Sequence, residues 1–186
     1  MSLILHVAAD KWRKHLASVI AGSDAQIVPV IKGNGYGFGK KVLAQEAKSL
    51  NLPVIAVATI AEAEELQTVF PGEILLLSPS AHMDSEKIIH TISPHSSVFS
   101  ANMPKKFVLE LLSPIHRHGF SVSDLGNALE KYSKSGKCEG IAIHLPIDQK
   151  TSAFEWINKN LQSITERGIT TTEFSNSVWI SHISEK

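Results

Sequence analysis

The feature that most constrains the fold of this chain is a rhythm of short apolar runs separated by stretches with helical periodicity. A weak apolar run covers residues 97–100, and six clearer runs cover residues 27–31, 54–58, 74–77, 107–112, 140–145 and 178–183. Most of the runs are continuously apolar, which is typical of strands buried on both faces. Strands of this kind that alternate with helices indicate parallel βαβ units.

The stretches between the runs have the spacing and the end signals of amphipathic helices. Residues 40–50 place several apolar side chains on one side. Thr59 is suited to cap a helix over residues 60–69, and Glu62 three residues later completes a capping box. Residues 123–133 and 153–167 show a similar pattern, and a glycine follows the second stretch as a C-cap residue does.

These elements predict an α/β fold with about seven parallel strands in one domain over residues 1–186. A closed (β/α)8 TIM-type barrel needs eight strands and typically about 250 residues. We therefore expect a barrel that is incomplete at its C-terminal end. A doubly wound open sheet is the alternative, and it would need no further strand.

Composition excludes several classes of partner and site. The chain has 18 Lys and Arg against 18 Asp and Glu, so a net charge of zero predicts no attraction to nucleic acid or to an anionic membrane. Cys138 is the only cysteine, so we expect no internal disulfide and no multi-cysteine metal site. No apolar stretch approaches the roughly 18 residues that span a bilayer, and no signal peptide is recognisable. A cytoplasmic protein is expected.

The densest chemical signal is the segment Lys-Gly-Asn-Gly-Tyr-Gly-Phe-Gly at residues 32–39. Four alternate glycines allow a tight loop that approaches a bound group closely. Lys32 follows a buried strand, where parallel barrels place their chemistry, and its amine is a nucleophile toward aldehydes. Tyr36 is suited to hold a phosphate or to pack against a ring. The glycine spacing fits neither a dinucleotide fingerprint nor a P-loop, and a flexible loop with a surface lysine is the alternative.

Residues 32–39 resemble the pyridoxal-phosphate lysine motif of alanine racemases, which are fold type III barrels. The resemblance implies that pyridoxal 5′-phosphate is held as a Schiff base on Lys32, and that Lys32 is one of two bases acting on the substrate α-carbon. It also implies that Tyr36 bonds the cofactor phosphate. Residues 54–66, with Glu62 and Ala63, are similar to the strand and "EA" helix that follow in that family.

Residues 116–120, His-Arg-His-Gly-Phe, resemble the Met-x-Arg-x-Gly segment of the family. The resemblance implies that Arg117 bonds the phenolic oxygen of the cofactor; a surface arginine between two solvated histidines is the alternative. Glu110 departs from the pattern, because many racemases carry a modified lysine there that helps to orient this arginine. A glutamate could pair with Arg117 instead, and the departure allows a subfamily with different chemistry.

Residues 139–148 resemble the family segment in which a strand begins after Glu-Gly and ends in a histidine. The resemblance implies that His144 lies on or near the cofactor ring; taken alone, His144 would be a satisfied core histidine. Ser184 leaves the apolar run at residues 178–183 and is the further candidate for binding the cofactor phosphate.

Together these matches imply a pyridoxal-phosphate-dependent isomerase, an amino acid racemase acting on a small substrate such as alanine. The eighth strand and the C-terminal β-domain of the family, which supplies the opposite-face base, have no counterpart in residues 1–186. We therefore expect this chain alone to be inactive or weakly active, and to cover its unpaired strand edge as a homo-oligomer. A non-catalytic cofactor-binding module and a small α/β phosphate-binding protein are the alternative functions.

Overall fold

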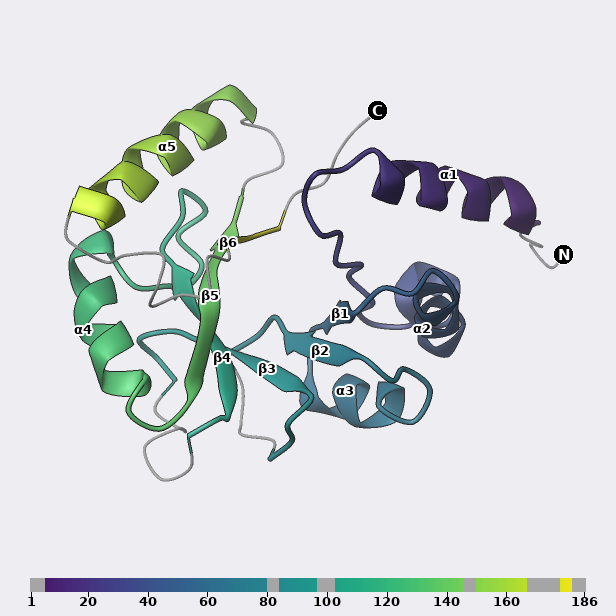
Figure 1. The fold of residues 1–186 in the computed structure, drawn as a ribbon, viewed down its shortest axis with the longest axis horizontal. Helices are drawn as coiled ribbons and strands as arrows, with labels where there is room; N and C mark the ends of the chain where they lie inside the picture. The colour runs from purple at the N-terminus through teal and green to yellow at the C-terminus, as the bar shows by residue number, and fades with distance from the viewer. Residues whose placement is uncertain (1–5, 80–83, 97–102, 146–149, 167–177, 182–186) are drawn as a thin grey trace, which may run out of the picture.

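The computed structural model describes residues 6–79, 84–96, 103–145, 150–166 and 178–181. These residues form one parallel sheet of six strands flanked by helices (Figure 1). The strands are β1 (Val54–Val57), β2 (Glu73–Leu76), β3 (Ile88–Ile92), β4 (Lys106–Leu111), β5 (Lys137–His144) and β6 (Val178–Ser181). The helices are α1 (Ala9–Ala21), the 3-10 turn η1 (Gly35–Gly37), α2 (Lys40–Ser49), α3 (Ile60–Leu66), α4 (Val122–Tyr132) and α5 (Lys150–Glu166).

The order of the strands identifies the sheet as part of a barrel. Each strand pairs in parallel with the next one along the chain, so the spatial order is β1 to β6 without a reversal. A doubly wound sheet would contain a switch point at which this order turns back. In Figure 1 the sheet curves, and α3, α4 and α5 lie along its outer side.

Side chains of the strands alternate between two apolar layers. Those that point outward pack in two clusters against the helices, for example Leu76 against Leu66 of α3 and Leu109 against Leu125 of α4. Those that point inward form a smaller cluster, which contains Val54, Ala56, Leu75, Ile89 and Val108. Burial on both faces explains why most of the strand sequences are continuously apolar.

Most of the predicted strands and helices are present, but the predicted count of seven strands differs from the six that the described residues form. Residues 27–31 make only a bridge, between Val30 and Ala56, because Pro29 has no N–H to donate to a ladder. The strand before β4 is Ile88–Ile92, which the sequence analysis missed. The run at residues 97–100, and the glycine expected to end α5, lie outside the described residues.

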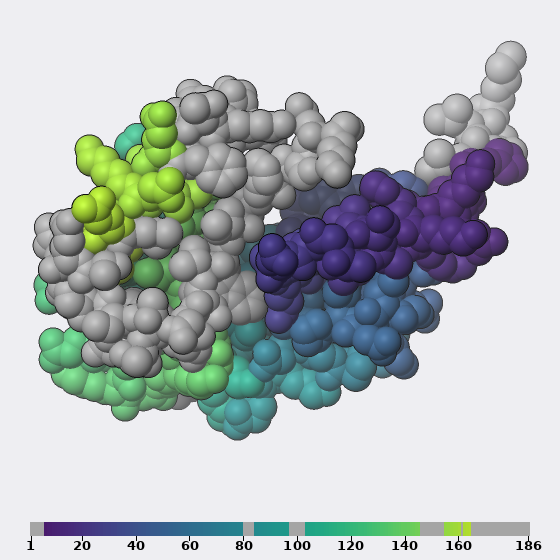
Figure 2. All heavy atoms as spheres, turned by 45° about the horizontal axis from the view of Figure 1, so that its top comes forward, coloured from purple at the N-terminus to yellow at the C-terminus, as the bar shows by residue number. Residues whose placement is uncertain are grey.

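The helix ends agree with the capping signals in the sequence. Thr59 caps α3 and forms the predicted capping box with Glu62, and Ser121 caps α4. The first helix, α1, contains no buried residue and lies as a ridge on the surface (Figure 2). Arg13 of α1 pairs with Glu46 of α2 at 2.6 Å. Among the described helices, none is both long and apolar enough to cross a bilayer.

Candidate active site

Lys32 follows a short extended segment that pairs with β1. The amide of Ile31 donates to the carbonyl of Ala56 (2.7 Å), and the amide of Ala56 donates to the carbonyl of Pro29 (2.9 Å). Ile31 is buried, whereas Lys32 is exposed. Since β1 ends at Val57, Lys32 lies at the carboxyl end of the sheet, where barrel enzymes carry their reactive groups.

The glycine-rich loop after Lys32 is a compact turn. The amide of Gly35 donates to the carbonyl of Lys32 (3.1 Å), and the amide of Gly39 donates to the carbonyl of Asn34 (2.9 Å). Tyr36 has a φ of 54°, a left-handed conformation that costs energy for a residue with a side chain and is concentrated at functional sites. The centroid of its ring lies 6.0 Å from Lys32 Nζ. The amine and the phenol ring therefore border the same space.

The loop after β4 folds back on the strand that it leaves. The amide of Phe120 donates to the carbonyl of Glu110 (2.7 Å), and the amide of Leu112 donates to the carbonyl of Phe120 (2.9 Å). This close return requires Gly119, because a Cβ at that position would lie 2.4 Å from the nitrogen of Leu112. The fold-back holds Arg117 at the carboxyl end of β4.

Arg117 is oriented by its neighbour His118. Its Nε donates a hydrogen bond of 2.8 Å to Nε2 of His118, so this ring nitrogen acts as an acceptor and carries no proton. Burial lowers the pKa of His118, and the charges of Arg117 and His95 lower it further. A histidine that stays neutral can hold the guanidinium in place through this bond.

His144 ends β5 and shows that the separate segments meet. Burial lowers its pKa, and the positive charges of Arg117, Lys32 and His118 lower it further, in that order. A coulombic effect weakens with distance, so each of these three charges is near enough to the imidazole to act on it. Lys32, Arg117 and His144 come from segments more than 25 residues apart, and the parallel sheet brings them to one end.

Glu110 lies near the end of β4, and its side chain faces the barrel interior, as the side chain of Val108 does two residues earlier. Its side chain is only 5% exposed, and within the described part of the chain its Oε2 has no hydrogen-bond partner. Burial raises the pKa of Glu110 to about 7, although the charge of Arg117 acts in the opposite direction. The sequence suggested that Glu110 could pair with Arg117. The charge of Arg117 does act on Glu110, but among the described residues Oε2 of Glu110 accepts no hydrogen bond.

The structure thus brings four of the five predicted site residues, Lys32, Tyr36, Arg117 and His144, to the carboxyl end of the sheet. Ser184, the fifth, lies outside the described residues. The sequence did not identify His118 as a hydrogen-bond partner of Arg117. The only sign of this contact in the sequence was that the two residues are adjacent. No group of three His, Cys, Asp or Glu side chains within the described ranges could hold a metal ion.

The sequence of the chain is similar to those of known alanine racemases. The chain is 31% identical over 174 residues to an alanine racemase of Campylobacter jejuni (strain 81-176), which covers 92% of this chain and 52% of the relative. It is 26% identical over 177 residues to an alanine racemase of Fusobacterium nucleatum, covering 86% of this chain and 50% of that protein. The chain spans about half the length of the relatives it matches.

The fold is also that of solved alanine racemases. An alanine racemase of Clostridium difficile 630 superposes with a TM-score of 0.69 at 19% identity, over 92% of this chain and 50% of that one. The enzyme of Bacillus anthracis, solved with bound L-Ala-P, gives a TM-score of 0.69 at 18% identity over the same shares. The family model described as "Alanine racemase, N-terminal domain" matches residues 8–178, so this chain belongs to the alanine racemase N-terminal domain family.

Proposed function

We propose that this chain binds pyridoxal 5′-phosphate covalently through Lys32 and forms the cofactor-binding part of an amino acid racemase. The observation that carries the proposal is the convergence of Lys32, Arg117 and His144 at one end of the sheet. Alanine racemases depend on this cofactor, and the chain belongs to their N-terminal domain family. By likeness to relatives named as alanine racemases, the substrate that we propose is alanine or another small amino acid.

The described residues fit the functional groups of the cofactor. Pyridoxal 5′-phosphate presents an aldehyde, a phenolic oxygen and a phosphate, which call for an amine and for cationic or hydrogen-bonding partners. Lys32 provides an exposed amine, and Arg117 provides a cation held by His118. Tyr36, on the glycine turn, provides a hydroxyl. The positive charges that lower the pKa of His144 also attract an anionic ligand.

Each residue has a role that follows from its charge. When bound, the cofactor supplies an electron sink for the pair left behind as the α-carbon loses its proton. Lys32 Nζ, when its amine is free, takes or returns that proton. Arg117 is a guanidinium cation that would bond the phenolic oxygen. His144 stays neutral because burial and its cationic neighbours disfavour the imidazolium, so it offers a flat ring without adding positive charge.

Cofactor binding and turnover are separate parts of the proposal. Racemisation requires acid–base groups on both faces of the α-carbon, and Lys32 provides one of them. A cofactor-binding module without turnover is therefore the second candidate. Ser184 remains a prediction as a phosphate-binding residue.

The covalent link is tested by loading the protein with pyridoxal 5′-phosphate, reducing it with borohydride and mapping the peptides by mass spectrometry. We expect the pyridoxyl group on Lys32, and we expect Lys32→Arg to abolish it. Lys40→Arg is the matched control, because Lys40 pairs with Glu65 and lies in α2 outside the cluster. Label on another lysine, or none at saturating cofactor, would overturn the proposal. A coupled D-alanine assay then separates a racemase from a binding module.

A further inference from the structure

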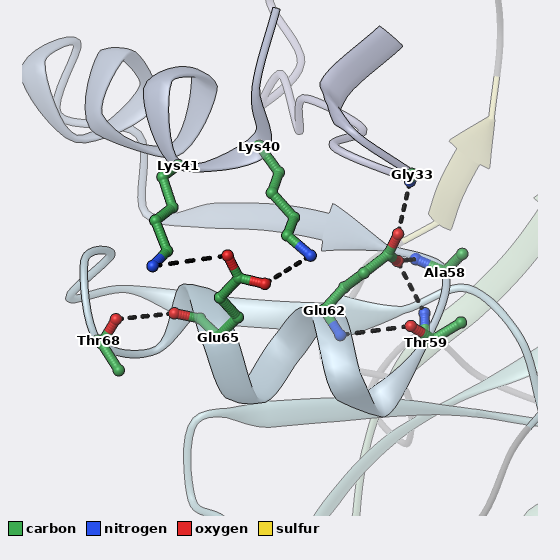
Figure 3. A network of polar contacts seen from close by, with 8 residues as sticks. All are labelled: Gly33, Lys40, Lys41, Ala58, Thr59, Glu62, Glu65 and Thr68. Atoms are coloured by element: carbon green, nitrogen blue, oxygen red, sulfur yellow. Dashed lines mark hydrogen bonds and ion pairs between the residues drawn. The ribbon is translucent and has the colours of Figure 1, made fainter. Parts of the chain in front are cut away.

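Glu62 in α3 accepts hydrogen bonds from two parts of the chain that are distant in sequence (Figure 3). Its Oε2 accepts from the amides of Ala58 (2.9 Å) and Thr59 (3.0 Å), and its Oε1 accepts from the amide of Gly33 (2.5 Å). The side chain is 8% exposed. All three donors are backbone N–H groups, and both oxygens of the side chain act as acceptors.

One of these bonds is unnecessary for starting the helix. A capping box needs the N3 carboxylate to reach back to the N-cap amide, which the bond to Thr59 achieves. The bond to Gly33 instead crosses 29 residues of sequence and ends at the peptide group that directly follows Lys32. The capping glutamate therefore also ties the glycine-rich loop to the β1–α3 turn.

Gly33 needs such an anchor. Its φ is 60°, and a Cβ built on it would meet nothing within 4 Å. The glycine is therefore required by the backbone conformation and not by lack of space, and glycine left without contacts samples many conformations. The bond from its amide to the buried carboxylate selects one of them. Because Lys32 shares this peptide group, the same bond fixes where the Lys32 side chain leaves the backbone.

As a comparison for Glu62, Glu65 lies one turn further along α3 and has partners other than the peptide after Lys32. Its carboxylate pairs with the side chains of Lys40 (2.5 Å) and Lys41 (3.6 Å), and its side chain is 36% exposed (Figure 3). These pairs join α3 to the start of α2, at the far end of the glycine-rich loop from Lys32. Surface ion pairs of this kind contribute little to stability.

We propose that Glu62 is a positioning residue for Lys32, holding the Lys32–Gly33 peptide so that the amine faces the space shared with Arg117 and His144. The role of Lys32 in cofactor binding rests on the proposed function, but the link between Glu62 and the loop does not. Hydrogen bonds to charged groups contribute about 1.5–3 kcal/mol, so losing this one should loosen the loop about 10- to 160-fold.

Two variants of Glu62 and two controls test the proposal. Glu62→Gln keeps the size of the side chain but replaces one acceptor oxygen with an NH2 donor. Glu62→Asp is shorter by one methylene, so it can still cap the helix but falls short of Gly33. Thr59→Ala removes the other half of the capping box and leaves the bond to Gly33, and Glu65→Gln removes only the surface pairs.

Two readouts separate positioning from stability. The first is amide hydrogen exchange at Gly33 in cofactor-free protein, corrected for the global stability of each variant by urea unfolding. The second is the rate at which pyridoxal 5′-phosphate with borohydride labels Lys32, relative to label on other lysines. We expect both Glu62 variants to exchange Gly33 about 10-fold faster or more and to label Lys32 more slowly, while both controls match the parent.

Two results would overturn the proposal, and a third would overturn the proposed function instead. Equal Gly33 exchange in the Glu62 variants and in Thr59→Ala would show that Glu62 only caps the helix. Faster exchange with unchanged labelling of Lys32 would show that the link does not position the amine. If Lys32 of the parent takes no label, the proposed function fails, while the exchange at Gly33 still decides whether Glu62 holds the loop.

Discussion

Replacing the buried carboxyl of Glu110 should make the protein more stable at alkaline pH. Burial raises the pKa of Glu110 from 4.5 to about 7, so the folded chain holds the proton more tightly than the unfolded chain does. This contribution to stability is fully present below pH 4.5 and is lost as the pH rises through about 7. At about 1.36 kcal/mol for each pH unit between the two pKa values, the loss amounts to about 3 kcal/mol.

The assay is urea unfolding of cofactor-free protein at about pH 5 and about pH 8. The parent should lose about 2–3 kcal/mol of unfolding free energy between these conditions because of Glu110. Glu110→Gln, which cannot ionise, should lose correspondingly less. Glu64→Gln, at an exposed position of α3, controls for general effects of removing a carboxyl group. The same pH dependence in the parent and in Glu110→Gln would refute the reasoning, because it would mean that the ionised carboxylate is fully compensated.

Two further predictions concern the carboxyl end of the sheet. Lys32→Ala should raise the pKa of His144, because it removes one of the positive charges that lower this pKa. The measurement is an NMR titration of the imidazole, with Lys40→Ala as the control that should leave the pKa unchanged. An unchanged His144 pKa in Lys32→Ala would contradict the convergence of these residues. Gly119→Ala should lower the free energy of unfolding by about 2–4 kcal/mol, because its Cβ would lie 2.4 Å from the backbone nitrogen of Leu112. Gly37→Ala is the control and should cost less, because its Cβ would meet nothing within 4 Å. Equal losses of the two variants in urea unfolding would contradict the fold-back of the loop after β4.

How much of the fold was predictable depended on the apolar content of each strand. The sequences of β2 and β4 are dominated by Val, Ile and Leu, so the patterns identified them. The strand β3 was missed because His90 and Thr91 interrupt its apolar run, although both are buried. Propensity and periodicity describe single segments, and burial of a polar residue in a strand depends on the neighbours that the fold supplies.

The candidate site was predictable where a local pattern carried it. The position of Lys32 after a strand and before alternate glycines could be inferred from the chain alone. The bond between His118 and Arg117 depends on a loop that folds back on β4, which no local pattern encodes. The link from Glu62 to Gly33 was hidden because the capping box already accounted for a glutamate at that position.

The most direct test of the account is a crystal structure of this protein with pyridoxal 5′-phosphate. We predict continuous density from Lys32 Nζ to the cofactor, with the Arg117 guanidinium at hydrogen-bonding distance from the phenolic oxygen and His144 in contact with the ring. The hydroxyl of Tyr36 should reach the phosphate. Cofactor bound elsewhere on the chain, or bound at Lys32 with both Arg117 and His144 out of contact, would contradict the central claim.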